Sequence, residues 1–345
     1  MRWRLITDDR AGAADGLALD EALMAPYARG EHPEQAATLR LYTYRPHCAL
    51  VGHYQSLEAE IDTDACARLD VEIGRRPTGG GAIIMGPGQL GVAITTQAPA
   101  GVGPRSLLAR YAEGIVAGLA TLGVRAAFRG KNDLTVEGRK VAGLGLYLDP
   151  QGGLLFHASV LCDLDVELML AVLRIPGAKL ADKGVSRVQQ RITTVQEQAG
   201  PAGTTDAVRD ALATAFARTL RVTLDPSRPT AEERARATRL VQERYAAAAW
   251  LTGRRRPPGA RGSAAFKTPG GLVRVYAGVQ RDALSSVMFA GDFSVMPPEL
   301  LALEGALRWC HAGPERIQEI IASHVPDGLL GVSAAELSAG VWGAA

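Results

Sequence analysis

A run of basic and glycine residues near position 80 could bind an anion. Residues 75–90 read RRPTGGGAIIMGPGQL, so two arginines precede three consecutive glycines. Consecutive glycines weaken helices and strands, but they let a ligand approach the backbone N–H groups closely. Arg75 and Arg76 add fixed donors that suit a phosphate or a carboxylate. The segment therefore predicts an anion pocket, with a flexible surface loop as the alternative.

A second candidate segment, residues 130–145, reads GKNDLTVEGRKVAGLG. It predicts a hairpin that turns at Glu137 and Gly138. In a regular second strand, Lys140 would project from one face and Gly143 would leave room on the other. A lysine in a hairpin is, on its own, most often a solvated charge. Neither this segment nor the first contains the GxxxxGK[ST] or GxGxxG pattern of the usual phosphate loops.

Composition limits the class of protein. The chain has 345 residues, 47% of them hydrophobic and 21% charged, which suits two or three globular domains. A formal charge of +2 gives no general case for nucleic acid or for a basic membrane surface as a partner. The first residues lack the apolar core of a signal peptide, and no run is long enough to span a bilayer, so we expect a cytoplasmic protein. The four cysteines show no metal-binding spacing and are expected to be buried spacers.

Periodicity predicts an α+β fold with a mixed or largely antiparallel sheet and flanking helices. Short strands dominate residues 37–97, and a further strand is expected at 154–162. Asp15 is placed to cap the first helix and Pro26 to end or kink it. Helices are predicted at 15–27, 106–122, 165–174, 206–220 and 230–250.

A break in composition separates two domains. Residues 253–262 read GRRRPPGARG, which can neither continue a helix nor pack as a core element. We therefore expect a first domain at 1–250, a linker with solvated arginines at 251–262, and a small α+β domain at 263–345.

The motifs together resemble the lipoate–protein ligase A family, in the biotin/lipoate ligase superfamily. They occur in that family's order and approximate spacing, and the resemblance extends more weakly into the C-terminal domain, which is similar to the accessory domain of two-domain ligases. The motifs are DGLALDEALM (15–24), VGHYQS (51–56), RRPTGGGAI (75–83), KNDLTVEGRKVAG (131–143), FHASVL (156–161) and KLADKGVSRVQQRITTV (179–195).

The resemblance implies a catalytic domain like that of class II aminoacyl-tRNA synthetases and a reaction in two steps. Lipoate and ATP would form lipoyl-AMP with release of pyrophosphate, and the lipoyl group would then pass to a lysine of a lipoyl domain. Mg²⁺ is expected with the nucleotide. The implied acceptors are the E2 subunits of 2-oxoacid dehydrogenases and the glycine cleavage H protein, and the enzyme would be a monomer.

The resemblance also implies the site residues. Lys140 would be catalytic, bridging the acyl carbonyl oxygen and a phosphate oxygen of the adenylate. Asp133 would position a phosphate or hold Mg²⁺. The residues implied to bind the lipoyl-adenylate are His53, Arg76, Gly79, Gly80, Gly81, Ala82, Asn132, Asp133, Gly143, His157 and Ser159.

One departure from the ligase pattern favours an alternative reaction. Met85 and Gly86 stand where the ligases typically carry a His-Asp pair, and the GPGQ that begins at Gly86 is similar to octanoyltransferases. Those enzymes take octanoate from acyl carrier protein through a cysteine thioester. In the transferases closest to the ligases that cysteine precedes the motif lysine by about a dozen residues, but residues 126–139 contain none. Cys162 is the remaining candidate, and the carboxylate of Asp163 beside it opposes a thiolate.

Two further alternatives stay open. A biotin–protein ligase has a similar lysine motif, but its characteristic glycine-arginine loop is missing here. An inactive lipoyl-binding homologue would retain the fold alone, and retention of Arg76, Asp133 and Lys140 argues against it. After His157, Ala158 and Ser159 replace the glycine and threonine usual in the ligases.

Overall fold

The structure is a computed structural model, which describes residues 1–31, 36–175, 185–186, 188–326 and 328–345. The motif predicted at 179–195 therefore lies partly outside the described residues. The chain forms two compact units. The first comprises Met1–Leu50, Ile61–Thr78 and Ile83–Leu251, and the second comprises Val51–Glu60, Gly79–Ala82 and Thr252–Ala345. Sequence analysis assigned 51–60 and 79–82 to the first domain, because sequence order alone gives no reason to separate them from their neighbours.

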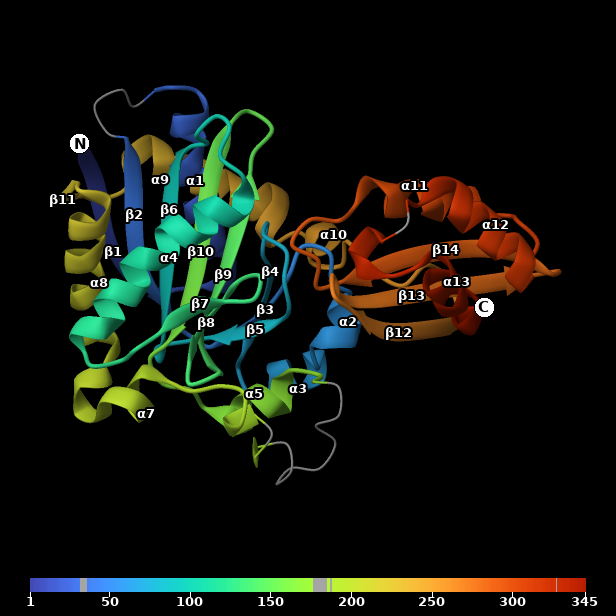
Figure 1. The fold of residues 1–345 in the computed structure, drawn as a ribbon. Coiled ribbons are helices and arrows are strands. Elements are labelled where there is room, and N and C mark those ends of the chain that lie inside the picture. The colour runs from blue at the N-terminus through green and yellow to red at the C-terminus, as the bar shows by residue number, and fades with distance from the viewer. Residues whose placement is uncertain (32–35, 176–184, 187, 327) are drawn as a thin grey trace. The chain divides into compact units, whose positions relative to one another are not determined.

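A mixed eight-stranded sheet forms the centre of the first unit (Figure 1). β1 pairs in parallel with β2 and β11, whereas the pairs β2–β6, β6–β10, β10–β9, β9–β8 and β8–β7 are antiparallel. This confirms the predicted fold class. In spatial order the strands are β11 (Thr223–Pro226), β1 (Arg2–Ala11), β2 (Ala37–Tyr44), β6 (Gln89–Gln97), β10 (Gly153–Leu161), β9 (Arg139–Leu148), β8 (Asp133–Val136) and β7 (Ala127–Arg129).

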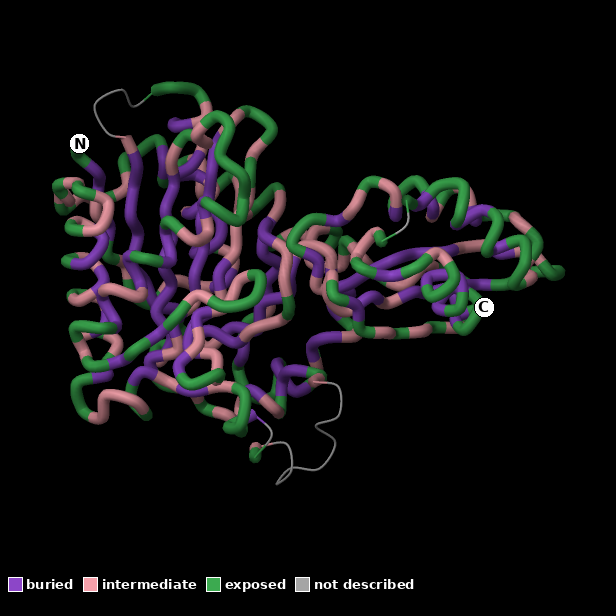
Figure 2. The backbone as a smooth tube through the Cα atoms, in the orientation of Figure 1, coloured by how far each residue is buried: buried purple, intermediate pink, exposed green. Residues whose placement is uncertain are grey.

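Helices cover both faces of this sheet, because its central strands carry apolar side chains on both sides. Residues of α4 (Pro104–Thr121) and α8 (Thr205–Leu220) form one core with β2, β6, β9 and β10. Residues of α1 (Ala13–Ala28) form a second core against the opposite face. The strands at the middle of the sheet are accordingly buried along most of their length (Figure 2).

The first helix starts differently from the prediction. Gly12 is the N-cap residue of α1 and makes no side-chain cap, so the expected capping role of Asp15 is wrong. The Glu72 carboxylate instead accepts a hydrogen bond of 2.5 Å from the Ala13 N–H. Pro26 lies inside the helix, two residues before its end.

The helix predicted at 230–250 is broken into three pieces. They are α9 (Ala231–Leu240), a π-helical turn η2 (Val241–Tyr245) and α10 (Ala248–Leu251). Thr230 and Glu233 form a capping box at the start of α9. The π turn brings Arg244 and the buried Tyr245 together on Glu21 of α1, with contacts of 2.7 and 2.5 Å. A tertiary interaction with α1 therefore accompanies a break that local helix propensity does not predict.

Smaller elements complete the first unit. A three-stranded sheet has the order β4 (Glu72–Arg75), β3 (Cys48–Val51) and β5 (Ile83–Met85). The short helical segments are α3 (Thr63–Arg68), α5 (Val166–Val172), α7 (Val195–Ala199) and η1 (Gly200–Gly203). None of the helices in the described part of the chain is long and apolar enough to cross a membrane.

The second unit is built on an antiparallel sheet of β12 (Gly262–Thr268), β13 (Gly271–Gln280) and β14 (Ala283–Gly291). Helices α11 (Pro298–Leu307), α12 (Pro314–His324) and α13 (Ala334–Ala344) contribute to its core, and α11 and α12 each begin with a proline in the first turn. The remaining segments are α2 (Leu57–Glu60) and η3 (Leu329–Gly331).

The arginines after Leu251 are not all solvated. Arg254 pairs with Glu304 and donates to the Phe289 carbonyl, with 19% of its side chain exposed. Arg256 donates to the carbonyls of Ala260 and Gly262. The expectation of a solvated linker is therefore wrong for these two side chains, because backbone carbonyls and a carboxylate of this unit accept from them.

Candidate functional site

A β-bulge at Val141 determines where the Lys140 side chain lies. β8 pairs with β9 at Asp133↔Gly143 and at Thr135↔Lys140, so β9 contains one extra residue between these pairs. Val141 and Ala142 are both fully buried in the core under α4 and α8. Because the bulge interrupts the alternation of side chains, Lys140 lies on the same face as Gly143. The expectation that they lie on opposite faces is wrong, since it assumed a regular strand.

Lys140 forms an ion pair with the other charged residue of its motif. Its Nζ lies 2.8 Å from Asp133 Oδ1, and the two side chains are 35% and 40% exposed. A Cβ added to Gly143 would lie 3.0 Å from the same Nζ and 3.6 Å from Ser159 Oγ. Lys140, Asp133, Gly143 and Ser159 therefore form one cluster on this face of the sheet.

The backbone of Lys140 is held by a distant part of the chain. Its N–H donates to the Arg191 carbonyl at 2.7 Å, and its carbonyl accepts from the Thr193 N–H at 2.9 Å. Asn132 holds the same strand further along, since its amide donates to the Leu144 carbonyl at 3.1 Å. These contacts position the lysine through the main chain and leave its amine available.

Three glycines on this face let side chains from elsewhere lie directly against the sheet. A Cβ on Gly91 would lie 2.7 Å from the Tyr42 ring, and one on Gly145 would lie 3.4 Å from Thr78. Gly143 is covered by Lys140 in the same way. Thr78 directly precedes Gly79 in the chain, so the residue before the three glycines lies on the face that carries Lys140.

Sequence analysis missed a buried polar network next to this cluster. His157 and Ser159 lie directly opposite Gly145 and Gly143 across the β9–β10 ladder. His157 Nε2 lies 2.8 Å from Oδ2 of Asp20, a fully buried residue of α1. Asp20 also accepts from the Arg40 guanidinium at 2.7 Å and from the Tyr42 hydroxyl at 2.8 Å.

The network keeps a buried carboxylate ionised. Burial opposes ionisation of Asp20, but the Arg40 charge and the contact with His157 outweigh it and hold the pKa of Asp20 below its usual range. Arg40 reaches Asp8 as well, at 2.7 Å, and its centre lies 3.9 Å from that of the Tyr42 ring. His157 is therefore fixed in orientation by a charge on α1. The sequence signal was the Asp20–Glu21 pair inside an apolar helix, whose partners in β2 and β10 no local pattern identifies.

Arg76 lies deep in the first unit. It is 8% exposed and donates to the Leu50 carbonyl at 2.8 Å. Burial lowers its pKa to about 10. Arg75 is also buried, and it donates to the carbonyl of Leu251 at the end of α10. Both arginines therefore make contacts with the main chain, and the anion binding expected of them stays a prediction.

The glycine loop and its partner loop belong to the second unit. The Gly80 N–H donates to the Phe293 carbonyl at 2.9 Å, and a Cβ on Gly79 would lie 1.9 Å from that oxygen. A Cβ on Gly52 would lie 2.0 Å from the Gly80 carbonyl. Gly79 and Gly52 thus allow backbone to approach backbone. A Cβ on Gly81 would meet no atom within 4 Å in the described structure, so this glycine has open space beside it.

The two other predicted residues of these loops are also in the second unit. His53 packs edge to face on Tyr54, with ring centroids 4.5 Å apart. Ala82 is half-buried and directly follows the open Gly81. Their predicted contacts with the adenylate remain predictions.

All four cysteines are unfavourably placed for thiolate chemistry. Cys48, Cys66 and Cys162 are buried, and Cys310 is partly buried. Burial raises the pKa of Cys162 to about 12 and that of Cys66 to about 11, and it raises the pKa values of Cys48 and Cys310 as well. A cysteine nucleophile needs a pKa lowered towards neutrality, so none of the four has the required environment.

Asp133 is the one predicted metal ligand. Within the described residues, no group of three or more His, Cys, Asp or Glu side chains could hold a metal ion. A metal that accompanies a nucleotide needs only one or two carboxylates, since phosphates and water supply the other ligands. Asp133 fits that limited role.

Lys140, Asp133 and the fixed His157 lie on one face of the mixed sheet of the first unit. The model of the lipoyl protein ligase A/B catalytic domain matches residues 13–217. The chain belongs to this family of lipoate ligases and transferases, and it is an enzyme of that family.

The curated relatives include transferases. The octanoyltransferase LipM of Symbiobacterium thermophilum is 32% identical over 273 residues, which cover 72% of this chain and 97% of the relative. That alignment leaves more than a quarter of this chain outside it.

Solved structures of ligases share the fold. A bi-partite lipoate protein ligase from Thermoplasma acidophilum, studied with its E2 lipoyl domain, is 27% identical, with a TM-score of 0.66 over 73% of this chain and 97% of that one. A lipoate-protein ligase A bound with ATP is 25% identical, with a TM-score of 0.64 over 73% and 99%. LipL1 of P. falciparum, in complex with lipoate, has a TM-score of 0.69 over 92% and 94%, and at 16% identity it shows the fold alone.

Proposed function

We propose that this protein is an ATP-dependent lipoate–protein ligase. It would convert lipoate and ATP to lipoyl-AMP and pyrophosphate and then transfer the lipoyl group to a lysine of a lipoyl domain. The single observation that carries the choice is the burial of Cys48, Cys66 and Cys162 and the partial burial of Cys310, which raises the pKa of each thiol. A transfer through an enzyme thioester needs a cysteine thiolate, whereas transfer through an adenylate needs none.

The first step brings two anions together. A lipoate carboxylate oxygen attacks the α-phosphorus of ATP, and the bond from that phosphorus to the β-phosphate oxygen breaks. The Lys140 amine would contact both reacting groups and offset the charge that builds up between them. Its position beside Gly143 and Ser159 supports this role, because no bulky side chain stands between the amine and that face of the sheet.

The second step uses the same amine. The neutral amine of the acceptor lysine attacks the acyl carbonyl carbon, the bond to the AMP oxygen breaks, and the attacking nitrogen loses a proton. Lys140 would donate to the carbonyl oxygen as negative charge develops on it. The backbone contacts with Arg191 and Thr193 support this role, since they fix the strand that carries the amine.

The ion pair of Lys140 with Asp133 has to open during the cycle. When nucleotide binds, Lys140 would exchange the carboxylate for phosphate oxygens, and Asp133 would become available to Mg²⁺. Mg²⁺ supplies charge neutralisation of the phosphates when it is bound. The partial exposure of both side chains supports this exchange, because neither is locked in the core.

The proposed acceptors are lipoyl domains of E2 subunits and the H protein of glycine cleavage, and the proposed state is a monomer in the cytoplasm. The archaeal ligase studied with its E2 lipoyl domain supports the first part of this proposal. The fold match to LipL1 extends over 92% of the chain and supports a two-domain fold, whereas the LipM alignment covers only 72%.

Octanoyl transfer from acyl carrier protein is the second candidate. The LipM relative favours it, as does the GPGQ segment at Gly86. For this reaction Cys162 would have to lose its proton in a buried position, next to the Val160 carbonyl at 3.8 Å. That environment opposes a thiolate, so we place this candidate second.

A purified-enzyme assay separates the candidates. The full chain is incubated with a lipoyl domain and either lipoate plus ATP or octanoyl acyl carrier protein without ATP. A third reaction contains biotin, ATP and a biotin acceptor domain. The mass of the acceptor and the release of pyrophosphate are measured in each reaction. The proposal expects lipoylation and pyrophosphate release only with the first donor. Nucleotide-independent octanoylation that is lost in Cys162→Ser would overturn it. Inactivity with every donor would favour a binding role.

A further inference from the structure

Arg129 on the edge strand β7 is a charged residue that the site described above does not use. β7 is the last strand of the eight-stranded sheet and pairs with β8. Arg129 lies directly opposite Asp133 in this pair of strands. Side chains that lie directly opposite each other in an antiparallel pair point to the same face, with Cβ atoms about 5 Å apart. Arg129 is therefore a cross-strand neighbour of the carboxylate that pairs with Lys140.

The core of the first unit shows independently which face Arg129 occupies. Phe128 packs against the core under α4 and α8, and the buried Leu134 opposite it belongs to that core. Because side chains alternate along a strand, the residues next to these two, Arg129 and Asp133, lie on the other face of the sheet. That face also carries Lys140, whose amine contacts Asp133.

Arg129 stands at one end of a row of directly opposed residues that crosses the sheet from β7 to β2. The row ends at Tyr42, which is buried, whereas Arg129 is exposed. Charged side chains are at the β7 end, and small residues follow them. A substrate that lies along the row would therefore meet charge at β7. In spatial order the row consists of Arg129, Asp133, Gly143, Ser159, Gly91 and Tyr42.

The guanidinium of Arg129 is placed to contact an anion. Within the described residues no carboxylate pairs with it, since the Asp133 carboxylate opposite it contacts the Lys140 amine at 2.8 Å. A guanidinium presents its N–H donors in one plane, which suits two oxygens of a phosphate group. Phosphates held at Asp133 would lie next to Arg129, because the two residues are cross-strand neighbours.

We propose that Arg129 contacts the β- and γ-phosphates of ATP and stabilises the pyrophosphate that leaves. This inference rests on the proposed function, because it takes the substrate to be a nucleotide whose α-phosphate contacts Lys140. Lys140 lies on β9, two strands and about 10 Å from β7. When the bond from the α-phosphorus breaks, its electron pair stays on the β-phosphate oxygen. The guanidinium would offset the negative charge that develops there.

Binding measurements test the contact without turnover. The full chain is titrated calorimetrically with ATP or with AMP, in the presence of Mg²⁺ and without lipoate. We expect Arg129→Ala to raise the dissociation constant for ATP about tenfold, because a charged contact is lost. The constant for AMP should not change, since AMP has only the α-phosphate. Arg129→Lys should recover part of the affinity for ATP, because it keeps the charge without the planar shape.

The two half-reactions give a second readout. Release of pyrophosphate from lipoate and ATP should slow at least about tenfold in Arg129→Ala, because the leaving group loses a charged donor. Transfer from pre-formed lipoyl-AMP to a lipoyl domain should keep the parent rate, since pyrophosphate takes no part in that step. Equal slowing of both half-reactions would show that the arginine acts on the fold or on the acceptor and would refute the inference.

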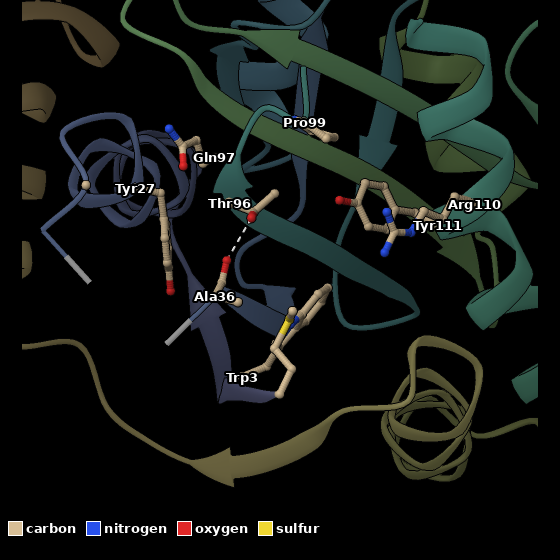
Figure 3. Close-up of a pocket in the computed structure, with 10 residues that line it drawn as sticks. Trp3, Tyr27, Ala36, Thr96, Gln97, Pro99, Arg110 and Tyr111 are labelled. Carbon is tan, nitrogen blue, oxygen red and sulfur yellow. Dashed lines mark hydrogen bonds between the residues drawn. The ribbon is translucent and has the colours of Figure 1, made fainter. Parts of the chain in front are cut away.

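Arg110→Ala is the matched control. Arg110 is an exposed arginine of α4, which packs on the opposite face of the sheet, and Figure 3 shows its side chain beside Tyr111. This variant should match the parent in every assay. If the parent is active with lipoate and ATP and Arg129→Ala keeps its ATP affinity and its rate of pyrophosphate release, the inference alone fails. If the parent neither binds ATP nor releases pyrophosphate, the proposed function fails with it.

Discussion

The Lys140 amine is the residue on which the proposed chemistry depends. It is one-third exposed and its backbone is held by Arg191 and Thr193, so the side chain can change partners without moving the strand. In the structure the partner of the amine is Asp133. In both proposed half-reactions its partner would be an oxygen of the substrate. A group of this kind contributes mainly to the rate of reaction and little to stability.

Replacement of the lysine should remove activity and leave the fold intact. We expect Lys140→Ala to lower kcat/KM for lipoylation by about 10²- to 10³-fold, because a charged donor to the transition state is lost. Lys140→Arg should recover part of the rate, since it restores the charge in a different shape. Lipoylation assays and thermal unfolding check both statements. The exposed Lys267 of β12 gives a matched control, whose alanine variant should keep full activity.

The Asp20 network should contribute stability that depends on pH. Because the pKa of Asp20 is lowered in the folded protein, its contribution is present above the pKa of the unfolded chain, near 3.8, and is lost as pH falls through the folded value. We expect Asp20→Asn to reduce the free energy of unfolding at pH 7 by about 3 kcal/mol, since Arg40 loses a buried counter-charge.

Denaturant unfolding at several pH values measures this effect. The difference between the parent protein and Asp20→Asn should be largest at neutral pH and should narrow below about pH 4. A difference that stays constant from pH 7 to pH 3 would contradict the assignment of the charge to Asp20.

At the scale of elements, the glycine loop makes contacts of two kinds. Gly79 lies against the Phe293 carbonyl, where a Cβ would stand 1.9 Å from the oxygen, whereas Gly81 has open space. We expect Gly79→Ala to destabilise the protein by about 1–3 kcal/mol, because backbone has to move. Gly81→Ala should leave the thermal unfolding midpoint unchanged, because the added methyl group would meet no atom of the described structure within 4 Å. Equal loss of stability in both variants would contradict this distinction.

Local chemistry made several elements predictable from sequence. The two-residue turn at Glu137 and Gly138 is confirmed, and both residues have the positive φ that such a hairpin turn needs. The starts of α11 at Pro298 and α12 at Pro314 also follow from local chemistry, since the fixed φ of proline suits the first turn of a helix.

Long-range contacts explain what the sequence did not reveal. β1 was not predicted, because Arg4 interrupts its apolar pattern. The buried Arg4 side chain pairs with Glu233 and also donates to the Arg228 carbonyl. The bulge at Val141 depends on the match between two strands and a core under α4 and α8. Of the predicted site residues, Lys140, Asp133, Gly143 and Ser159 form one cluster, because an unpredicted bulge places Lys140 on the face that carries Gly143. The contacts that hold His157 and Arg76 come from Asp20 and Leu50, which precede them by 137 and 26 residues.

At the scale of the whole molecule, two loops of the first 100 residues are held by the C-terminal unit. Arg274 pairs with Glu60 at 2.8 Å, the Gly291 N–H donates to the Tyr54 carbonyl at 2.9 Å, and the Gly80 N–H donates to Phe293. The glycine loop is therefore held by contacts within the C-terminal unit, although it comes from the first 100 residues of the chain.

Removal of the C-terminal unit should expose these loops. In a chain that ends at Leu251, we expect faster amide hydrogen exchange at 51–60 and 79–82 than in the full protein, because their partners are missing. The centre of the eight-stranded sheet around β6 and β10 should keep its protection, since its core lies within the first unit. Addition of residues 252–345 as a separate chain should restore protection of the loops. Unchanged exchange at both loops after truncation would contradict this grouping.

An oxygen-isotope experiment tests the adenylate route most directly. The full protein is incubated with ATP, a lipoyl domain and lipoate whose two carboxylate oxygens are ¹⁸O, and the AMP is analysed by mass spectrometry. If lipoyl-AMP is the intermediate, the bond between the carbonyl carbon and the AMP oxygen breaks in the second step, so each AMP should carry one ¹⁸O. Lipoylated acceptor formed together with unlabelled AMP, or without AMP, would contradict the account.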